Sequence, residues 1–377
     1  MSRPTRITTP FDKTATAAEI VAGLNLTGRR AVVTDASSGL GTETARALAS
    51  AGAEVTLAVR DTEAGQRAAA AIIDDSPGAA VSVMPLELTD RTSVAAFVAA
   101  WQGPLHVLVG NAGVSGMPEK RTPDGWEYNF AANYLGHFAL ALGLHGALAA
   151  AGDARVVALS SCSHALSPGA IHFDDIHFEH RAYTPALAYA QSKTANVLFA
   201  VEATRRWAAD GVLVNAVHPG GVRTNLHRHM PEETLSDAGR QAMRDWPWRT
   251  VEQGAANSVL AAASPLLQGV GGRYFENCDE ALPRDPGVAA TDVDNAGVAP
   301  YAIDPDIAAR LWDVSTAMLR DAGWIDALAL VSSQPLVSSQ PLVSSQPLVS
   351  PQTLVSPQQP LVSPQPLCHH KLMKYII

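Results

Sequence analysis

Tyr189 and Lys193 form a pair of side chains suited to proton transfer. They lie within residues 185–207, which are predicted to form one long helix, and a spacing of four residues places both on one helix face. A free phenol has a pKa of about 10, which is too high for ready proton exchange near neutral pH. An ammonium nearby favours the phenolate and lowers that pKa. The pair can therefore act as a general acid or base, although alone it also fits a buried tyrosine beside a solvated lysine.

A glycine-rich turn near the N-terminus is the second feature suited to chemistry. Residues 34–41 read Thr-Asp-Ala-Ser-Ser-Gly-Leu-Gly and join a short apolar run to a helical segment. Such a turn lets the backbone approach a pyrophosphate, and the helix N-terminus supplies N–H donors and a positive dipole. The turn therefore predicts a phosphate-binding site.

The elements that must position these residues alternate regularly along the chain. Candidate strands cover residues 31–34, 54–59, 81–86, 105–109, 155–160, 212–217 and 273–275, and candidate helices cover 42–51, 62–74, 93–101, 126–151, 185–207, 252–263 and 307–320. The strands are apolar on both faces, as buried parallel strands are. The alternation predicts an α/β fold of the Rossmann type, with a doubly wound parallel sheet in a single three-layer α/β/α domain.

Unusual residues follow five of the predicted strands. These clusters are residues 35–41, Arg60, residues 111–113, the pair Ser160 and Ser161, and residues 219–221. Ligands of doubly wound sheets bind beyond the carboxyl ends of the strands. We therefore expect the five clusters to meet at one edge of the sheet.

In combination and order, these motifs resemble the classical short-chain dehydrogenase/reductase family over about residues 28–320. The family pattern T-G-x-x-x-G-x-G corresponds to residues 34–41, N-A-G to 111–113, the helix Asn to Asn133, the catalytic Ser to Ser161, Y-x-x-x-K to 189–193 and P-G to 219–220. Residues 136–138, 192–199 and 217–222 are similar to one branch, which includes retinol dehydrogenase-like and WW-domain oxidoreductase-like enzymes.

The resemblance implies a role for each catalytic residue. Tyr189 would donate a proton to a carbonyl oxygen during hydride transfer and remove it in the reverse direction. Lys193 would lower the pKa of Tyr189 and bind the nicotinamide ribose. Ser161 would orient the substrate oxygen, with Ser160 as the neighbouring candidate. Asn133 would hold a water that links Lys193 to solvent, although hydrogen bonds to the backbone also explain an asparagine inside a helix.

The cofactor implied by the resemblance is a nicotinamide dinucleotide. An acid at the end of the second strand would select NAD, but that place holds Val59, followed by Arg60. Because a guanidinium suits a 2′-phosphate, NADP(H) is favoured and NAD(H) stays possible; Arg60 could instead pair with Asp61. The predicted cofactor-binding residues are Thr34, Ser37, Ser38, Gly39, Leu40, Gly41, Arg60, Glu87, Leu88, Asn111, Ala112, Gly113, Tyr189, Lys193, Pro219, Gly220, Val222 and Thr224.

Asp35 departs from the family pattern, which has glycine at this position. Aspartate tolerates a left-handed φ better than most residues, so the turn can survive. Its carboxylate would lie near the cofactor phosphates and weaken binding, unless the side chain turns away into solvent.

Two functions of different classes fit these observations. The first is an NADP(H)-dependent short-chain dehydrogenase/reductase (EC 1.1.1.-), such as a carbonyl reductase, that interconverts an alcohol and an aldehyde or ketone. The alternative is a cofactor-binding sensor or scaffold with little turnover, because of Asp35. A hydrolase is disfavoured, since the sequence lacks a G-x-S-x-G elbow.

Composition limits the partners. The net charge of −9 without a basic run disfavours nucleic acid. Three cysteines without paired spacing, and histidines at 164, 172, 177 and 180 without zinc spacing, predict a reducing cytoplasm and no metal. The N-terminus lacks the apolar core of a signal peptide, and no run of 18 apolar residues predicts a membrane span.

The predicted organisation has three parts. Residues 1–28 form an N-terminal arm, 29–326 the Rossmann domain with a small helical cap at about 222–250, and 327–377 a disordered low-complexity tail with a six-residue repeat, for which a binding role is the alternative. The cap carries Leu226, Met230, Trp246 and Trp248, which suggests a partly apolar small-molecule carbonyl or alcohol substrate. The resemblance implies a homodimer or homotetramer through the helices that begin near Trp126 and Pro185.

Overall fold

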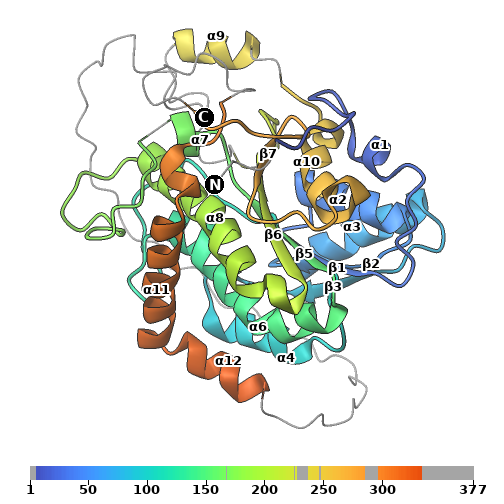
Figure 1. The fold of residues 1–377 in the computed structure, drawn as a ribbon, viewed down its shortest axis with the longest axis horizontal. Coiled ribbons are helices and arrows are strands. Elements are labelled where there is room, and N and C mark those ends of the chain that lie inside the picture. The colour runs from blue at the N-terminus through green and yellow to red at the C-terminus, as the bar shows by residue number, and fades with distance from the viewer. Residues whose placement is uncertain are drawn as a thin grey trace, which may run out of the picture.

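The computed structural model describes residues 6–166, 168–224, 226, 237–245, 248–284 and 296–332. Its centre is an eight-stranded sheet in the order β3-β2-β1-β4-β5-β6-β7-β8 (Figure 1). The strands are β1 (Arg30–Thr34), β2 (Glu54–Val59), β3 (Val81–Pro85), β4 (Val107–Gly110), β5 (Ala154–Leu159), β6 (Val212–Val217), β7 (Tyr274–Glu276) and β8 (Asp279–Glu280). Neighbouring strands from β3 to β7 run parallel, and β8 is antiparallel to β7.

Helices cover both faces of the sheet, which confirms the predicted three-layer Rossmann architecture (Figure 1). One face carries α2 (Gly39–Ser50), α3 (Thr62–Asp75) and α10 (Val251–Ala263), and the other carries α4 (Arg91–Ala100), α6 (Gly136–Ala151) and α8 (Pro185–Trp207). The central strands are buried on both faces, as their continuous Val, Ala and Leu runs require.

The winding direction reverses between β1 and β4. Strand β1 pairs with β2 on one side and with β4 on the other, so the loops that follow β1 and β4 diverge to opposite faces. This is the topological switch point at which doubly wound sheets bind ligands.

The smaller elements complete the chain. They are α1 (Ala17–Val21), α5 (Tyr128–Phe130), the π-helical η1 (Ala131–Leu135), α7 (Ser163–Leu166), the 3₁₀ turns η2 (Ala208–Asp210), η5 (Pro265–Leu267) and η6 (Pro300–Ile303), and the helices α9 (Asp237–Asp245), α11 (Pro305–Asp321) and α12 (Trp324–Ser332). The described part of the N-terminal arm packs on the domain: α1 buries Ile20, and the Ile7 N–H donates to Glu280 at 2.9 Å.

The prediction of one helix over residues 126–151 is wrong in one respect, because the helix is not regular throughout. It starts at Tyr128 and contains the π segment η1, where the Gly136 N–H donates to the Ala131 carbonyl five residues earlier. By length and composition this stretch could cross a membrane, and no other described helix could. Here its Phe138, Leu144 and Leu148 are 0–1% exposed and form part of the core.

The predicted start of the tail at Ala327 is also wrong. Helix α12 continues to Ser332, because Trp324 and Leu328 bury their side chains in the core that includes α4 and α6. The rest of the predicted tail, residues 333–377 with most of the repeat, lies outside the described residues.

Helix α8 offers no exposed face over most of its length. Every residue from Ala188 to Ala200 is buried within the single chain, and α11 lies along α8 (Figure 1). Trp312 of α11 packs edge-on against Phe138 and Trp207 at 4.9 and 5.3 Å between ring centroids. Within the single chain, α11 therefore covers this part of α8, and the oligomeric state that the resemblance implies stays a prediction.

Candidate active site

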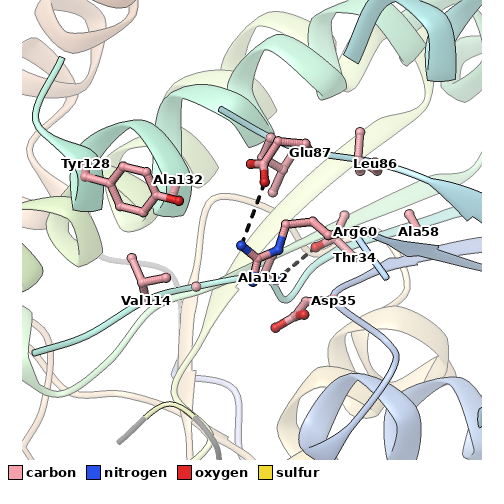
Figure 2. A pocket seen from close by; sticks show the side chains of 12 residues that line it. Thr34, Asp35, Ala58, Arg60, Leu86, Glu87, Ala112, Val114, Tyr128 and Ala132 are labelled. Atoms are coloured by element: carbon pink, nitrogen blue, oxygen red, sulfur yellow. Dashed lines mark hydrogen bonds and ion pairs between the residues drawn. The ribbon is translucent and has the colours of Figure 1, made fainter. Parts of the chain in front are cut away.

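A cleft opens at the carboxyl edge of the sheet and has two adjoining parts. With open solvent included, the larger part spans about 950 Å³ and the smaller about 450 Å³, and both are lined by Asp35, Arg60 and Gly113. The larger part is also lined by Ser37, Ser38, Gly39, Leu40, Asn111, Leu159, Ser160, Tyr189, Lys193, Pro219, Thr224 and Leu226. The smaller part is shown in Figure 2 and is also lined by Thr34, Ala58, Leu86, Glu87, Leu88, Ala112, Val114, Tyr128 and Ala132.

The catalytic pair predicted from the sequence lies on the buried side of α8. Tyr189 lines the larger part of the cleft. Burial raises the pKa of Tyr189 above its ordinary value, while its interaction with the Ser161 side chain lowers it in part. The ammonium nitrogen of Lys193 lies 5.5 Å from the phenol ring centroid. That Lys193 lowers the pKa of Tyr189 stays a prediction.

Lys193 is fully enclosed and has one strong partner. Its Nζ donates to the Leu159 carbonyl at 2.9 Å, and that carbonyl also accepts from the Asn196 side chain at 2.8 Å. Burial lowers the pKa of Lys193 to about 7. The Lys193 side chain lies at the base of the cleft. Because its pKa is near neutral pH, it can gain or lose a proton there.

A Lys193→Met variant is expected to be more stable than the parent chain at pH 6, with Tm higher by about 2–4 °C. The substitution removes a buried ammonium, and the Leu159 carbonyl keeps Asn196 as a partner. Between the folded pKa of about 7 and the ordinary 10.5, the unfolded chain binds a proton that the folded chain does not, so parental stability rises with pH. Thermal melts at pH 6 and pH 9 test this. A difference in Tm between variant and parent that widens with pH would contradict it.

The two serines after β5 have different partners. The Ser160 hydroxyl donates to the backbone carbonyl of Lys193 at 2.8 Å. The Ser161 hydroxyl instead lies 3.1 Å from the Ser163 hydroxyl, and its interaction with Tyr189 lowers the pKa of that phenol. Ser160 is the serine that lines the cleft, and the assignment of Ser161 as the catalytic serine stays a prediction.

Asn133 lies in η1 and its side chain is fully engaged. The amide oxygen accepts from the Val114 N–H at 2.8 Å, and the amide nitrogen donates to the Val114 carbonyl at 3.0 Å and to the Ser192 hydroxyl at 2.9 Å. Its backbone carbonyl lies 3.1 Å from Nδ1 of His137. These contacts give Asn133 a role in joining the loop after β4 to α8.

The glycine-rich turn has the backbone geometry of a phosphate site. Asp35 and Gly39 adopt left-handed φ values of 53° and 58°. A Cβ on Gly41 would lie 2.6 Å from the Asp35 carbonyl and from the Asn111 amide nitrogen, so only glycine fits there. Helix α2 begins at Gly39, three residues before the predicted start, and the Ser38 side chain does not cap it. The first N–H groups of α2 therefore face the cleft without a side-chain acceptor from Ser38.

Arg60 reaches across the smaller part of the cleft, as Figure 2 shows, between Glu87 and Asp35. Its guanidinium lies 3.8 Å from the Glu87 carboxylate, and the side chain is 53% exposed. The alternative that paired Arg60 with Asp61 is wrong, because Asp61 caps α3 and accepts from the Ala64 N–H at 2.9 Å.

The segment that follows β6 borders the larger part of the cleft. Gly220 has a φ of 85°, and a Cβ there would lie 2.4 Å from Nε of Arg249. Val222 forms a bridge with Arg249 and packs on α10 at Gly254. Arg249 was not predicted from the sequence, because it lies nearly thirty residues from the motif that it supports.

The predicted helical cap is described in part. Its described residues include α9, Leu226 and Trp248. Leu226 lines the larger part of the cleft, whereas Trp248 does not. Met230 and Trp246 lie outside the described residues.

The histidines noted in the sequence have structural partners. Nδ1 of His164 lies 2.5 Å from the Ser161 carbonyl, and Nε2 accepts from the Ala299 N–H at 3.3 Å. Nδ1 of His177 accepts from the Glu127 N–H at 3.1 Å. Within the described ranges there is no group of three His, Cys, Asp or Glu residues suited to a metal ion.

A doubly wound sheet with a glycine-rich turn at its switch point and a Tyr–Lys pair on the facing helix defines the class as a Rossmann-fold oxidoreductase. The family profile described as Enoyl-(Acyl carrier protein) reductase matches residues 35–276, and the chain belongs to the short-chain dehydrogenase/reductase family. This confirms the resemblance seen in the sequence.

Individual relatives agree with this assignment. The chain is 49% identical over 305 residues to a Streptomyces antibioticus protein named as a probable oxidoreductase, with 79% of this chain and 100% of that protein covered. It is 36% identical over 329 residues to the WW domain-containing oxidoreductase of Homo sapiens, with 84% and 75% covered. A solved structure from Beutenbergia cavernae is similar at a TM-score of 0.53 and 27% identity, over 67% of this chain and 95% of that chain. It is described as an NAD(P)-dependent gluconate 5-dehydrogenase with NADP bound at low occupancy.

Proposed function

We propose that this protein is an NADP(H)-dependent oxidoreductase that interconverts an alcohol with an aldehyde or ketone. The observation that carries the proposal is that Tyr189 and Lys193 lie together in the cleft that begins at the N-terminus of α2, and that the Ser161 side chain interacts with Tyr189. A proton donor and a hydroxyl that can hold the same substrate oxygen are the protein groups that carbonyl reduction needs.

The residues of the cleft fit a nicotinamide dinucleotide. The N–H groups at the start of α2 would hold the pyrophosphate, and Lys193 would bind the nicotinamide ribose. The smaller part, lined by Leu88, Val114 and Tyr128, would take the adenosine. When bound, the cofactor supplies or accepts a hydride. Ser161 orients the substrate oxygen, and Tyr189 exchanges the proton at that oxygen.

Arg60 supports the preference for NADP(H). An Arg60→Ala substitution is expected to weaken NADPH binding about tenfold and to leave NADH binding nearly unchanged, because only NADPH carries the 2′-phosphate that a guanidinium binds. Fluorescence titration of both nucleotides measures the two affinities. Glu87→Gln is the matched control, since it releases Arg60 from its acidic partner and is expected to strengthen NADPH binding. An equal loss for NADPH and NADH in Arg60→Ala would overturn the assignment.

The substrate is proposed to be a partly apolar small molecule, since Leu226 lines the cavity beside the catalytic residues. Residues 222–250 are proposed to act as its cap. We also propose a cytoplasmic location, in keeping with cysteines that show no paired spacing; cell fractionation tests this.

The experiment that tests the function is titration of the full chain with NADPH and NADH, followed by NADPH oxidation assays on aldehydes and ketones of graded size. Tight NADPH binding with turnover of any of these carbonyls supports the proposal. Binding without turnover favours a sensor or scaffold, the second candidate, which Asp35 at the phosphate turn supports.

A further inference from the structure

His137 is a buried residue that joins two parts of the cofactor site, although no motif of the sequence assigns it a role. Its Nε2 lies 2.9 Å from the Thr34 hydroxyl at the end of β1. Its Nδ1 lies 3.1 Å from the Asn133 carbonyl in η1. The ring is 8% exposed and therefore has no substantial access to solvent.

The partners determine where the hydrogen atoms lie. Burial lowers the pKa of His137 to about 4, so the ring is neutral near pH 7 and carries one N–H. A carbonyl can only accept, so Nδ1 donates to Asn133 and Nε2 must accept from the Thr34 hydroxyl. The direction of the Thr34 O–H bond is therefore set by His137.

Because the Thr34 O–H bond points to His137, the Thr34 hydroxyl oxygen can accept two other hydrogen bonds. It accepts from the Asn111 N–H and from the Ala112 N–H, each at 2.9 Å. The Asn111 side chain in turn donates to the Thr34 carbonyl at 2.9 Å. Thr34 and Ala112 line the smaller part of the cleft, and Asn111 lines the larger.

We propose that His137 is a positioning residue for the cofactor site, which acts by orienting the Thr34 hydroxyl. The competing acceptor is the Val109 carbonyl, 3.4 Å from the Thr34 oxygen. Without the histidine, the hydroxyl hydrogen turns toward Val109 and the oxygen lone pairs turn away from the two amides. The turn at 111–113 then loses two of the contacts that hold it against the end of β1 and keeps the bond from the Asn111 side chain. This inference rests on the proposed function for its link to cofactor affinity.

Gly110 makes room for this histidine. A Cβ on Gly110 would lie 3.1 Å from Cδ2 of His137 and 3.4 Å from the Val157 carbonyl. The first contact is closer than ordinary van der Waals packing allows. Gly110 and His137 therefore form a matched pair in which a side chain at position 110 would require the His137 ring to shift by a few tenths of an ångström.

The test compares His137→Phe, Thr34→Val and the double variant, with Thr34→Ser as the matched control that keeps the hydroxyl. NADPH affinity is expected to fall about tenfold in His137→Phe and similarly in Thr34→Val, as for loss of one buried hydrogen bond. The double variant is expected to lose little more than either single change, because both break one linkage. Thr34→Ser is expected to stay within about twofold of the parent. A lower Tm in His137→Phe with unchanged NADPH affinity would show a merely structural role and overturn the proposal.

Amide hydrogen exchange of the ligand-free chain tests the same linkage without the cofactor. The Asn111 and Ala112 amides are expected to exchange faster in His137→Phe than in the parent, relative to amides of β5. Unchanged exchange would overturn the positioning role, whether or not the chain binds nicotinamide nucleotides. If exchange rises but the parent binds neither NADPH nor NADH, the proposed function fails while the positioning role holds.

The matched pair has its own test in the same assay. Gly110→Ala is expected to accelerate exchange at Asn111 and Ala112 in the parent, because the added methyl group displaces the ring. In a His137→Ala background the same substitution is expected to add no further acceleration. If Gly110→Ala accelerates exchange equally in both backgrounds, the added methyl group clashes with the Val157 carbonyl and not with His137. That result would contradict the matched pair.

Discussion

Replacing Tyr189 by phenylalanine is expected to lower kcat for carbonyl reduction about 10³-fold, while the NADPH dissociation constant changes little. The substitution removes the hydroxyl that interacts with Ser161 and keeps the ring in its buried place. General acid catalysis by a positioned side chain contributes on the order of 10²–10⁴ in rate, so its loss appears in kcat. Steady-state kinetics and NADPH titration on the same preparation measure the two effects.

The pH dependence of the parent provides a second view of Tyr189. Because burial raises its pKa, the phenol stays protonated through neutral pH. Reduction, which needs the protonated form, is expected to stay level between about pH 6 and 8, whereas alcohol oxidation, which needs the phenolate, rises with pH. Ser161→Ala is the control, since it removes the neighbouring hydroxyl and keeps the acid; its loss in kcat is expected to be smaller. Full activity in Tyr189→Phe would remove the proposed mechanism.

Replacing Asp35 by glycine is expected to tighten NADPH binding about a hundredfold. The residue lines both parts of the cleft, at the turn where the pyrophosphate would lie. Two unit charges about 6 Å apart at an effective dielectric constant of 20 repel by roughly 3 kcal/mol, which corresponds to that change in affinity. Fluorescence titration of the parent and of Asp35→Gly measures it.

Asp35→Asn separates charge from backbone geometry. Asn removes the charge and still tolerates the left-handed φ of 53° that this position adopts. If repulsion is the cause, Asn and Gly recover similar affinity, and added salt narrows the gap to the parent because it screens exposed charges. Recovery with Gly alone would assign the effect to the backbone, and unchanged affinity in both variants would refute the idea that Asp35 weakens binding.

These two results also decide between the candidate functions. An enzyme requires that Tyr189 matter for turnover, whereas a sensor requires only that nucleotides bind. A chain that binds NADPH weakly until Asp35 is replaced, and then turns over carbonyls, would be an oxidoreductase whose activity is limited by one residue at its phosphate turn.

The sequence by itself determined the order of the elements and the identity of the motif residues. Alternating apolar strands and helices specify a doubly wound sheet because each strand must be covered on both faces. The Gly turn, Ser161, Tyr189 and Lys193 were recognisable because their chemistry depends on local spacing or on strand ends, which the sequence displays directly.

The tertiary structure alone decided the properties that depend on distant neighbours. The partner of Arg60 is Glu87 from the loop that follows β3, not Asp61 beside it. The link from His137 to Thr34 spans 103 residues, and α11 covers α8 from a later part of the chain. The pKa of Tyr189 rises because folding removes water from around it. Local spacing can place two side chains on one helix face. Only the fold determines how much solvent remains around them and which residues from distant parts of the chain contact them.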